Sequence, residues 1–444
     1  MKKSGLILFN TLGRKLETFK PIHKNEVRIY VCGPTVNDVP HLGHARQQIV
    51  FDVLRKYLKF IGYKVKFVSN ITDIEDKIIN KAKELNEDIK TLTARNLKTH
   101  LEDYKQIGVE KPDVQPKATE YIKEMIDLVK KLEKKDYTYI IENDGVYFDI
   151  SKFKNYGKLS GQNIKELKSS RIGIKEEKRN KEDFVLWKFS KKDEPSWESP
   201  FGSGRPGWHI ECSAMSSNIL GLPFDIHGGG QDLIFTHHED EIAQSEAGYG
   251  KKFVNYWIHN GMVNVNKIKM SKSLGNFKTI RDLLKDYSGS VIRYFVISTH
   301  YRNPIDFSKQ ALDDAKNSYE RLKNIISEIK NDKKINKDYL DKFKEAMNSD
   351  LNTSKALSVL WELIRDEKAI GKYETINKID KVFGLDLLKK EKINIPNEIR
   401  ELVNKRERAR KNKDWKKADE LRNEIAKRGW SVNDTPKGYI LKRV

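Results

Sequence analysis

The spacing of apolar residues changes twice between residues 27 and 70. From Val27 to Val31, apolar and polar residues alternate, as in a half-buried β-strand. Alternation returns at Val65 and Phe67. Between these stretches the apolar positions recur at helical spacing, and they are Ile49, Val50, Val53, Leu54, Tyr57, Leu58 and Ile61. The pattern predicts a strand, a helix and a second strand, which form one βαβ unit and begin a parallel sheet.

Candidate chemistry lies where this unit turns from strand to helix. Cys32 directly follows the first strand, and the turn from His41 to His44 precedes the helix. Ligands of parallel sheets bind at the carboxyl ends of the strands, so we expect the chemistry here. The helix start offers free N–H groups and a positive dipole end to a triphosphate, His41 and His44 add donors, and Gly43 leaves room for a base or sugar. The alternative is that the two histidines are ordinary polar residues.

Helical spacing also predominates further along the chain. It runs over 312–329 and 356–364, which predicts a helical bundle from about 308 to 390, with Asn352 or Thr353 able to cap its second helix. A further helix is expected around Glu120 to Lys134 and a strand at Gly145 to Ile150. No apolar run approaches the length of a membrane span, so no membrane partner is expected. The apolar stretch at residues 6–9 is too short for a signal peptide.

The composition is strongly basic. The chain has 85 Lys+Arg against 64 Asp+Glu, a formal net charge of +21, which predicts attraction to phosphate backbones, although a biased genome would give the same composition. The segment from Asn404 to Arg428 is more specific, because a run of Lys and Arg lies on one predicted helix. Beyond it, Trp430 and Tyr439 offer rings for stacking on unpaired bases. A solvated helix face is the alternative. A hydrophobic fraction of 38% over 444 residues suggests three or four domains.

The only two cysteines of the chain, Cys32 and Cys212, each lie beside a motif, which favours metal ligation over a disulfide and a reducing cytoplasm as the setting. On a helix, His237 and Glu241 are one turn apart, and together with the cysteines they can form a tetrahedral zinc site. His238 competes, because it reaches Glu241 at three-residue spacing, and the spacing does not choose between the two histidines. The alternative is a pair of reduced core cysteines beside a charged helix.

A second candidate for phosphate chemistry is the run from Lys269 to Ser273, with the sequence Lys-Met-Ser-Lys-Ser. Lys269 and Lys272 can neutralise the charge that grows as pyrophosphate leaves. In so basic a chain, a lysine pair is also typical of a solvated loop. The order of the two motifs, histidine turn first and lysine loop second, makes coincidence much harder to accept.

These motifs resemble the HIGH and KMSKS signatures of the class I aminoacyl-tRNA synthetases, and the chain is most similar to the cysteinyl-tRNA synthetases. Further runs that match this family are Cys32–Val36, Asn70–Asp73, Asp183–Lys188, Gly207–Met215, Phe224–Gly230 and His237–Glu241. The resemblance implies a ligase that activates L-cysteine with ATP and Mg²⁺ and transfers it to the terminal adenosine of tRNA(Cys). It also implies one zinc ion per chain, which selects cysteine over serine by its thiolate, and a monomer.

The resemblance also implies individual roles. Zinc ligands are Cys32, Cys212, His237 and Glu241. Cysteine contacts are Thr72, Trp208 and His227. ATP contacts are His41, Gly43, His44, Gly229, Asp232, Lys269 and Lys272, with Asp232 on the ribose. Catalytic roles fall to His41, His44, Lys269 and above all Lys272, in the transition state. Plain packing is the alternative for Trp208.

The implied fold is α/β, with a Rossmann-like parallel-sheet catalytic domain interrupted by a connective insertion and followed by a helical bundle and a small anticodon-binding domain. The expected ranges are 1–114 and 199–250 for the two catalytic halves, 115–198 for the insertion, 251–307 for the unit with the KMSKS loop, 308–390 for the bundle, and 391–444 for the basic anticodon-binding region.

Two other functions fit parts of the sequence. A related ligase would join cysteine to an amino sugar, but we would not expect it to have a basic, anticodon-type end. A catalytically dead paralogue would only bind RNA, and the intact histidines, cysteines and lysines of the motifs argue against it.

Overall fold

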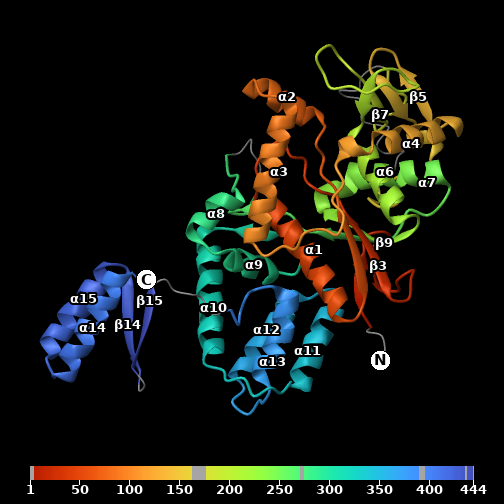
Figure 1. Cartoon of the computed structure of the whole chain (residues 1–444). Coiled ribbons are helices and arrows are strands. Elements are labelled where there is room, and N and C mark those ends of the chain that lie inside the picture. The colour runs from red at the N-terminus through yellow and green to blue at the C-terminus, as the bar shows by residue number, and fades with distance from the viewer. Residues whose placement is uncertain (1–4, 163–176, 271–274, 390–395, 436–437, 444) are drawn as a thin grey trace. The chain divides into compact units, whose positions relative to one another are not determined.

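The chain divides into two compact units, Met1–Leu388 and Lys389–Val444, each with its own core (Figure 1). The structure is a computed structural model, and it describes residues 5–162, 177–270, 275–389, 396–435 and 438–443. Within these residues, no helix combines the length and apolar character that crossing a membrane requires.

A parallel sheet of four strands, in the order β10-β9-β3-β4, forms the centre of the first unit. Helix α1 (Leu42–Phe60) connects β3 to β4 and buries its apolar positions in the main core. The predicted βαβ unit is therefore confirmed. In the register, Val31 of β3 lies beside Ser69 of β4 and Gly228 of β9, so the carboxyl ends of the strands meet at one edge. The strands are β3 (Glu26–Val31), β4 (Lys64–Ser69), β9 (Phe224–Gly230) and β10 (Val254–Asn260).

An antiparallel sheet, β5-β6-β7-β8, belongs to the insertion between β4 and β9. It extends to Pro206, and the parallel sheet extends to Asn260, so the boundaries expected at 198 and 250 each cut a sheet. Strand β8 has only three residues, which are too few for an alternating pattern. Nearly all residues of β10 are buried, so this strand also lacks the pattern of a half-buried strand. The insertion contains α4 (Ile122–Lys134), β5 (Thr138–Ile141), β6 (Gly145–Phe148), β7 (Phe184–Phe189) and β8 (Gly204–Pro206).

Helix α6 (Trp208–Leu220) leads from the insertion to β9, α7 (Glu239–Tyr249) lies between β9 and β10 in the chain, and the two helices pack against each other. Short helical turns, η3 (Gln231–Leu233) and η4 (Ile234–His238), join β9 to α7. Helices α2 (Asp76–Leu85) and α3 (Ile89–Gln106) follow β4, and the amino-terminal hairpin is β1 (Ile7–Asn10) with β2 (Lys15–Thr18).

A small three-stranded sheet, β12-β11-β13, follows the parallel sheet. Its strands are β11 (Val263–Val265), β12 (Ile268–Lys269) and β13 (Ile305–Phe307), and α8 (Ile280–Asp286) and α9 (Gly289–Ile297) lie between β12 and β13 in the chain. The predicted bundle follows as α10 (Lys309–Ser327), α11 (Lys337–Asn348), α12 (Thr353–Arg365) and α13 (Lys372–Phe383) (Figure 1). Asn352 caps α12 by accepting from the amide of Lys355 at 3.0 Å, as the sequence suggested.

The second unit consists of two helices and a hairpin, α14 (Asn397–Lys411), α15 (Trp415–Lys427), β14 (Trp430–Thr435) and β15 (Gly438–Arg443). The prediction of a single helix over Asn404–Arg428 is wrong, because two helices share this range. The chain breaks at Lys413, whose φ is 57°, and Asp414 begins a new helix by accepting from the amide of Lys417 at 3.0 Å. Trp430, expected on the surface, is only 5% exposed and belongs to the core of the unit.

Candidate active site and metal centre

Four residues from three distant segments of the chain meet beyond the carboxyl end of β3. Cys32 follows β3 directly, and its amide donates to the carbonyl of Gly228 on β9 at 3.1 Å. Cys212 lies on α6, and the two sulfur atoms are 3.5 Å apart. His237 lies on η4, and its Nε2 is 3.2 Å from Oε1 of Glu241, one turn later on α7.

These side chains form a compact donor set. The ligand atoms of Cys32, Cys212, His237 and Glu241 all lie within 4.8 Å of one another, and all four residues are buried. The Sγ of Cys32 is 3.3 Å from Oε1 of Glu241. Two thiols, an imidazole and a carboxylate are donors that suit zinc, so the residues present fit the metal that the sequence implies.

A second set overlaps the first. Cys32 and Glu241 also form a group with His227 and His238, within the same 4.8 Å limit. The Nε2 of His238 lies 3.3 Å from the sulfur of Cys32, and the Nε2 of His227 lies 2.8 Å from Oε2 of Glu241. The competition between His237 and His238 is therefore present in the structure as well as in the sequence.

Burial sets the charge states of the cluster. It raises the pKa of Cys32 well above its ordinary value, and the neighbouring Cys212 raises it further. Burial lowers the pKa of His237 well below its ordinary value, with the nearby His209 and His227 adding to the effect. The imidazole is consequently neutral near neutral pH, which is the form that binds metals.

His237 and His238, the two histidines that compete as metal ligands, each contact another histidine through Nδ1. The Nδ1 of His237 lies 2.8 Å from Nδ1 of His209, whose Nε2 is 3.4 Å from Oδ2 of Asp240. The Nδ1 of His238 lies 2.7 Å from Nε2 of His259. Partners of this kind fix the orientation and tautomer of a ligating ring. No local pattern in the sequence indicates His209, Asp240 and His259, because their roles depend on contacts between distant segments.

The expected cysteine contacts surround the same cluster. Thr72 is 2% exposed and donates from Oγ1 to Oε2 of Glu211 at 2.6 Å. The ring of Trp208, which is half-buried at the start of α6, lies 4.3 Å from the ring of His237. His227 is fully buried against Glu241, so it faces the metal cluster from the interior.

The histidine turn begins α1 as expected. His41 is the N-cap residue, and its Nδ1 accepts from the amides of Gly43 and His44 at 3.0 and 3.4 Å. The rings of His41 and His44 stack with centroids 3.8 Å apart. A Cβ on Gly43 would lie 2.8 Å from the ring of His41, so packing within the turn itself already requires a glycine there.

The segment that contains the signature lysines contacts this turn from both ends. Met270 lies beside Gly43, since its Cε would be 3.6 Å from a Cβ there. After the loop, the amide of Leu42 donates to the carbonyl of Lys278 at 3.0 Å, and the rings of His41 and Phe277 are 4.9 Å apart. Lys269 ends β12, paired with Asn264 of β11. Lys272 lies outside the described residues.

Two further ATP candidates lie at the end of β9 and just after it, in the same region. Gly229 lies one residue before the end of this strand, and a Cβ there would lie 2.9 Å from the ring of His238. Asp232 follows on η3 with its side chain exposed to solvent. Both residues lie at the edge of the parallel sheet at which β3 ends and near which the histidine turn begins α1.

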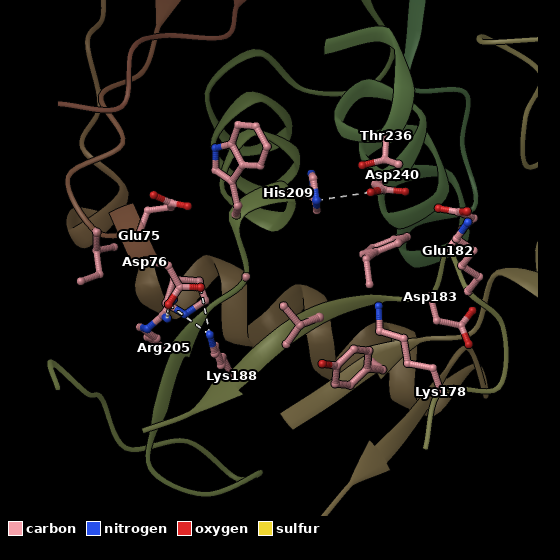
Figure 2. A pocket seen from close by; sticks show the side chains of 18 residues that line it. Glu75, Asp76, Lys178, Glu182, Asp183, Lys188, Arg205, His209, Thr236 and Asp240 are labelled. Carbon is pink, nitrogen blue, oxygen red and sulfur yellow. Dashed lines mark hydrogen bonds and ion pairs between the residues drawn. The ribbon is translucent and has the colours of Figure 1, made fainter. Parts of the chain in front are cut away.

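A cavity of about 310 Å³ opens between the insertion and the start of α6 (Figure 2). Trp208, His209 and Asp240 line it on the side of the metal cluster. On the side of the insertion, Asp76 pairs with Lys188 at 2.9 Å and with Arg205. The cavity therefore lies between the insertion and residues that flank the metal cluster, and its lining contains both acidic and basic groups.

Comparison with known proteins identifies the family. Residues 18–317 match the tRNA synthetases class I (C) catalytic domain, residues 342–388 a DALR domain, and residues 394–439 the cysteinyl-tRNA ligase anticodon binding domain. The chain is 48% identical to the cysteine–tRNA ligase of Thermococcus gammatolerans, covering 98% of this chain and 99% of that protein. It is 45% identical to the cysteine–tRNA ligase of Haemophilus influenzae, covering 99% and 100%.

The chain belongs to the cysteine–tRNA ligases. The expected resemblance is thereby confirmed, as is the α/β fold class. Among solved structures, methionyl-tRNA synthetase of Mycobacterium tuberculosis in complex with methionyl-adenylate has the same fold, with a TM-score of 0.59 at 14% identity over 81% of this chain and 90% of that one.

In this member of the cysteine–tRNA ligases, the second unit presents an aromatic group that the sequence analysis missed. Trp415 is 57% exposed at the start of α15, and the guanidinium of Arg410 lies 5.7 Å from its ring. Tyr439 is 41% exposed, as expected for a stacking residue. A tryptophan at the first position of a helix, directly after a capping aspartate, was the signal that could have identified Trp415.

Proposed function

We propose that the protein activates L-cysteine with ATP and transfers the cysteinyl group to the terminal adenosine of tRNA(Cys), releasing AMP and pyrophosphate. The observation that carries this proposal is the meeting of the Cys32 cluster and the histidine turn at one edge of the parallel sheet, in a chain of this family. No general base is needed, because the carboxylate of cysteine is itself the nucleophile on the α-phosphate. The protein positions the reactants and balances charge.

Zinc is proposed to be held by Cys32, Cys212, His237 and Glu241. The surroundings of the two histidines support this set over its competitor, because His237 contacts Trp208 and His209, which line the cavity, whereas His238 is fully buried against His259. A metal that accepts a substrate sulfur needs ligands on the accessible side of the site. In this arrangement His227 holds Glu241, and His209 orients His237.

When bound, zinc supplies a soft Lewis acid that favours a thiolate over a serine hydroxyl, which stays protonated near neutral pH. A pocket that relied on shape alone would gain only about 1–3 kcal/mol from the difference between cysteine and serine. Thr72 and Trp208 are proposed to contact the amino acid beside the cluster. Both thiols must stay reduced for this role, so a reducing cytoplasm is the proposed setting, and one chain supplies the whole donor set, as a monomer requires.

The histidine turn and the segment after β9 are proposed to bind ATP. His41, Gly43 and His44 lie at the positive end of α1, and Gly229 lies at the end of the neighbouring strand and Asp232 just after it, with Asp232 available to the ribose hydroxyls. Lys269 and Lys272 are proposed to neutralise the departing pyrophosphate, together with Mg²⁺.

The tRNA is proposed to contact two parts of the chain. The cavity beside Trp208 lies between the insertion and residues that flank the metal cluster, and the acceptor end is proposed to enter there. Trp415 and Tyr439 of the second unit offer exposed rings to unpaired anticodon bases, next to a basic helix. A ligase with a small amine acceptor would have no use for this second unit.

Two assays on the purified, zinc-loaded protein test the proposal. The first is charging of a tRNA(Cys) transcript, and the second is ATP–pyrophosphate exchange without tRNA, with cysteine or serine as substrate. We expect charging, and exchange that is far faster with cysteine than with saturating serine. Comparable exchange with both amino acids would refute zinc selection. Exchange without charging would favour an amine-acceptor ligase, and neither activity would favour an RNA-binding paralogue.

A further inference from the structure

Arg46 lies two residues after the histidine turn, and its side chain is almost entirely buried at 1% exposure. Its guanidinium donates to three main-chain carbonyls. These are Met262 from Nη1 at 2.7 Å, Tyr301 from Nη2 at 3.1 Å, and Asn303 from Nη2. Within the described parts of the chain, no carboxylate pairs with Arg46, and burial lowers the pKa of its guanidinium to about 10.

The three carbonyls belong to the two segments that enter strands β11 and β13 of the small sheet. Met262 directly precedes β11, which pairs with β12 and so with Lys269. Asn303 precedes β13, the other partner of β11. The same carbonyls also join the two segments to each other, because the amide of Ile305 donates to the carbonyl of Met262 at 3.0 Å. Arg46 therefore connects the first turns of α1 to the two segments that enter β11 and β13.

We infer that Arg46 is a positioning residue for adenylate formation, because it joins the helix that begins with the histidine turn to the small sheet that contains Lys269. This inference rests on the proposed ATP roles of the two motifs. The loop can neutralise pyrophosphate only if it lies at the correct distance from the turn, and an error of about 1 Å in such an arrangement can cost about 10²-fold in rate. A planar guanidinium can donate to several carbonyls at once, whereas an ammonium on a flexible stem holds them less rigidly.

The same segment is held from its opposite side by the bundle. Asp350, just before α12, accepts from the hydroxyl of Tyr301 at 2.7 Å and from Nε of Arg302 at 2.6 Å. It also accepts from the amide of Phe9 at 2.8 Å. Residues 301–303 are thus fixed between Arg46 and the bundle, and either contact can be altered separately.

The matched variants are Arg46→Lys and Arg55→Lys. Arg55 lies on the same helix and is also buried, at 5% exposure, but it donates to Lys111 and Asp113, which belong to neither motif. Both variants keep the charge and lose the fork of donors, so both should lose thermal stability. We expect pyrophosphate exchange by Arg46→Lys to fall about 30- to 100-fold, with the KM for cysteine unchanged within about twofold. Arg55→Lys should stay within about threefold of wild type.

A second readout separates positioning from general damage. Single-turnover transfer to tRNA from cysteinyl adenylate preformed on the enzyme should be unchanged in Arg46→Lys, because the pyrophosphate has already left. Equal exchange losses in the two variants, or equal losses of exchange and transfer in Arg46→Lys, would overturn the inference. A wild-type protein without exchange would instead refute the proposed function.

If Arg46→Lys does not fold, Asp350→Asn tests the inference instead. It loosens residues 301–303 from the side of the bundle and leaves Arg46 in place. We expect exchange to fall about three- to tenfold with transfer retained. Exchange equal to wild type in this variant would overturn the inference.

Discussion

The metal cluster and the second unit are built in opposite ways. In the cluster, residues separated by about two hundred positions meet in the interior, as Cys32 meets Cys212 at 3.5 Å. The second unit is one contiguous segment with a small core of Ile, Leu, Val and Trp side chains, and its charged and aromatic candidates, such as Trp415 and Lys416, are exposed.

This difference predicts different sensitivities to substitution. A buried donor set has no water to replace a lost group, so the removal of one member affects the whole site. An exposed RNA surface distributes its affinity over many contacts, each of which water and salt can partly replace. A single substitution in the buried site of the first unit should therefore abolish most of the activity, whereas a single substitution in the second unit should lower tRNA affinity only in part.

The largest effect is expected for Cys212→Ala. Loss of one sulfur should release zinc and lower cysteine-dependent exchange roughly 10³-fold, because metal chemistry contributes several kcal/mol. Zinc content by atomic emission is the measurement, with His238→Asn as control. His238→Asn should retain zinc, since His238 belongs only to the competing set. Zinc retained in Cys212→Ala and lost in His238→Asn would assign the metal to that competing set.

Asp52→Asn tests whether a buried site without metal is equally sensitive. Asp52 of α1 accepts from Arg293 of α9 and lies 2.8 Å from Lys56. Removal of one partner from such a buried pair costs roughly 3–5 kcal/mol of unfolding free energy. The substitution should therefore lower the temperature of the first thermal transition clearly, and a transition within a degree or two of wild type would contradict this expectation.

The pH dependence of the same pair has a defined sign. Burial by itself would raise the pKa of Asp52, but the charges of Arg293 and Lys56 prevail and hold it below its ordinary value. The stabilisation is therefore fully present above the unfolded pKa of about 4 and is lost as the pH falls through the lower folded value. The difference in stability between wild type and Asp52→Asn should be constant from about pH 5 to 7 and should narrow only below about pH 4.

Lys272→Ala tests the expectation that rests on the motif alone. We expect exchange to fall about 10²- to 10³-fold while the KM for cysteine changes little, because the lysine acts on charge that develops as pyrophosphate leaves. Pre-steady-state formation of the adenylate is the measurement. An unchanged rate would remove Lys272 from the mechanism and leave Lys269 as the candidate.

The sequence predicted local structure better than it predicted contacts between distant segments. The strand, helix and strand from Val27 to Phe67 follow from apolar spacing, because each element buries one face. The break at Lys413 was missed, although Asp414 is a good N-cap, because the charged composition continues across it. Trp430 was misassigned because only the folded hairpin places it with Val432 on the buried face.

The candidate site shows the same limit. The turn at His41 and the metal donors could be named from motifs, but spacing could not choose between His237 and His238. The second contacts of those rings, His209 and His259, come from other elements, and no local pattern indicates them. The role of Arg46 could not be predicted either, since its three acceptors are backbone atoms that no side-chain motif can reveal.

In the second unit, Trp415→Ala should weaken tRNA recognition by a moderate amount. Stacking of a base on an aromatic ring contributes about 1–3 kcal/mol, so the KM for tRNA in charging should rise about 10- to 100-fold. Exchange without tRNA should be unchanged, because the metal and ATP residues belong to the first unit. Tyr439→Ala tests the second exposed ring in the same way, and a loss of exchange in either variant would contradict a role limited to tRNA.

The smallest effect is expected for Lys416→Ala. Lys416 is exposed beside Trp415 and forms no ion pair with any described residue, whereas Lys417 pairs with Glu420 at 2.8 Å. A lysine that contacts one phosphate contributes about 0.7–0.9 to the slope of log affinity against log salt. Lys416→Ala should therefore weaken tRNA binding only a few-fold near physiological salt and reduce that slope by about one, while Lys417→Ala should change the slope less, because its charge is already partly neutralised. If Lys416→Ala abolished tRNA binding, the second unit would be as sensitive to a single substitution as the metal cluster, and the proposed difference between the two regions would be refuted.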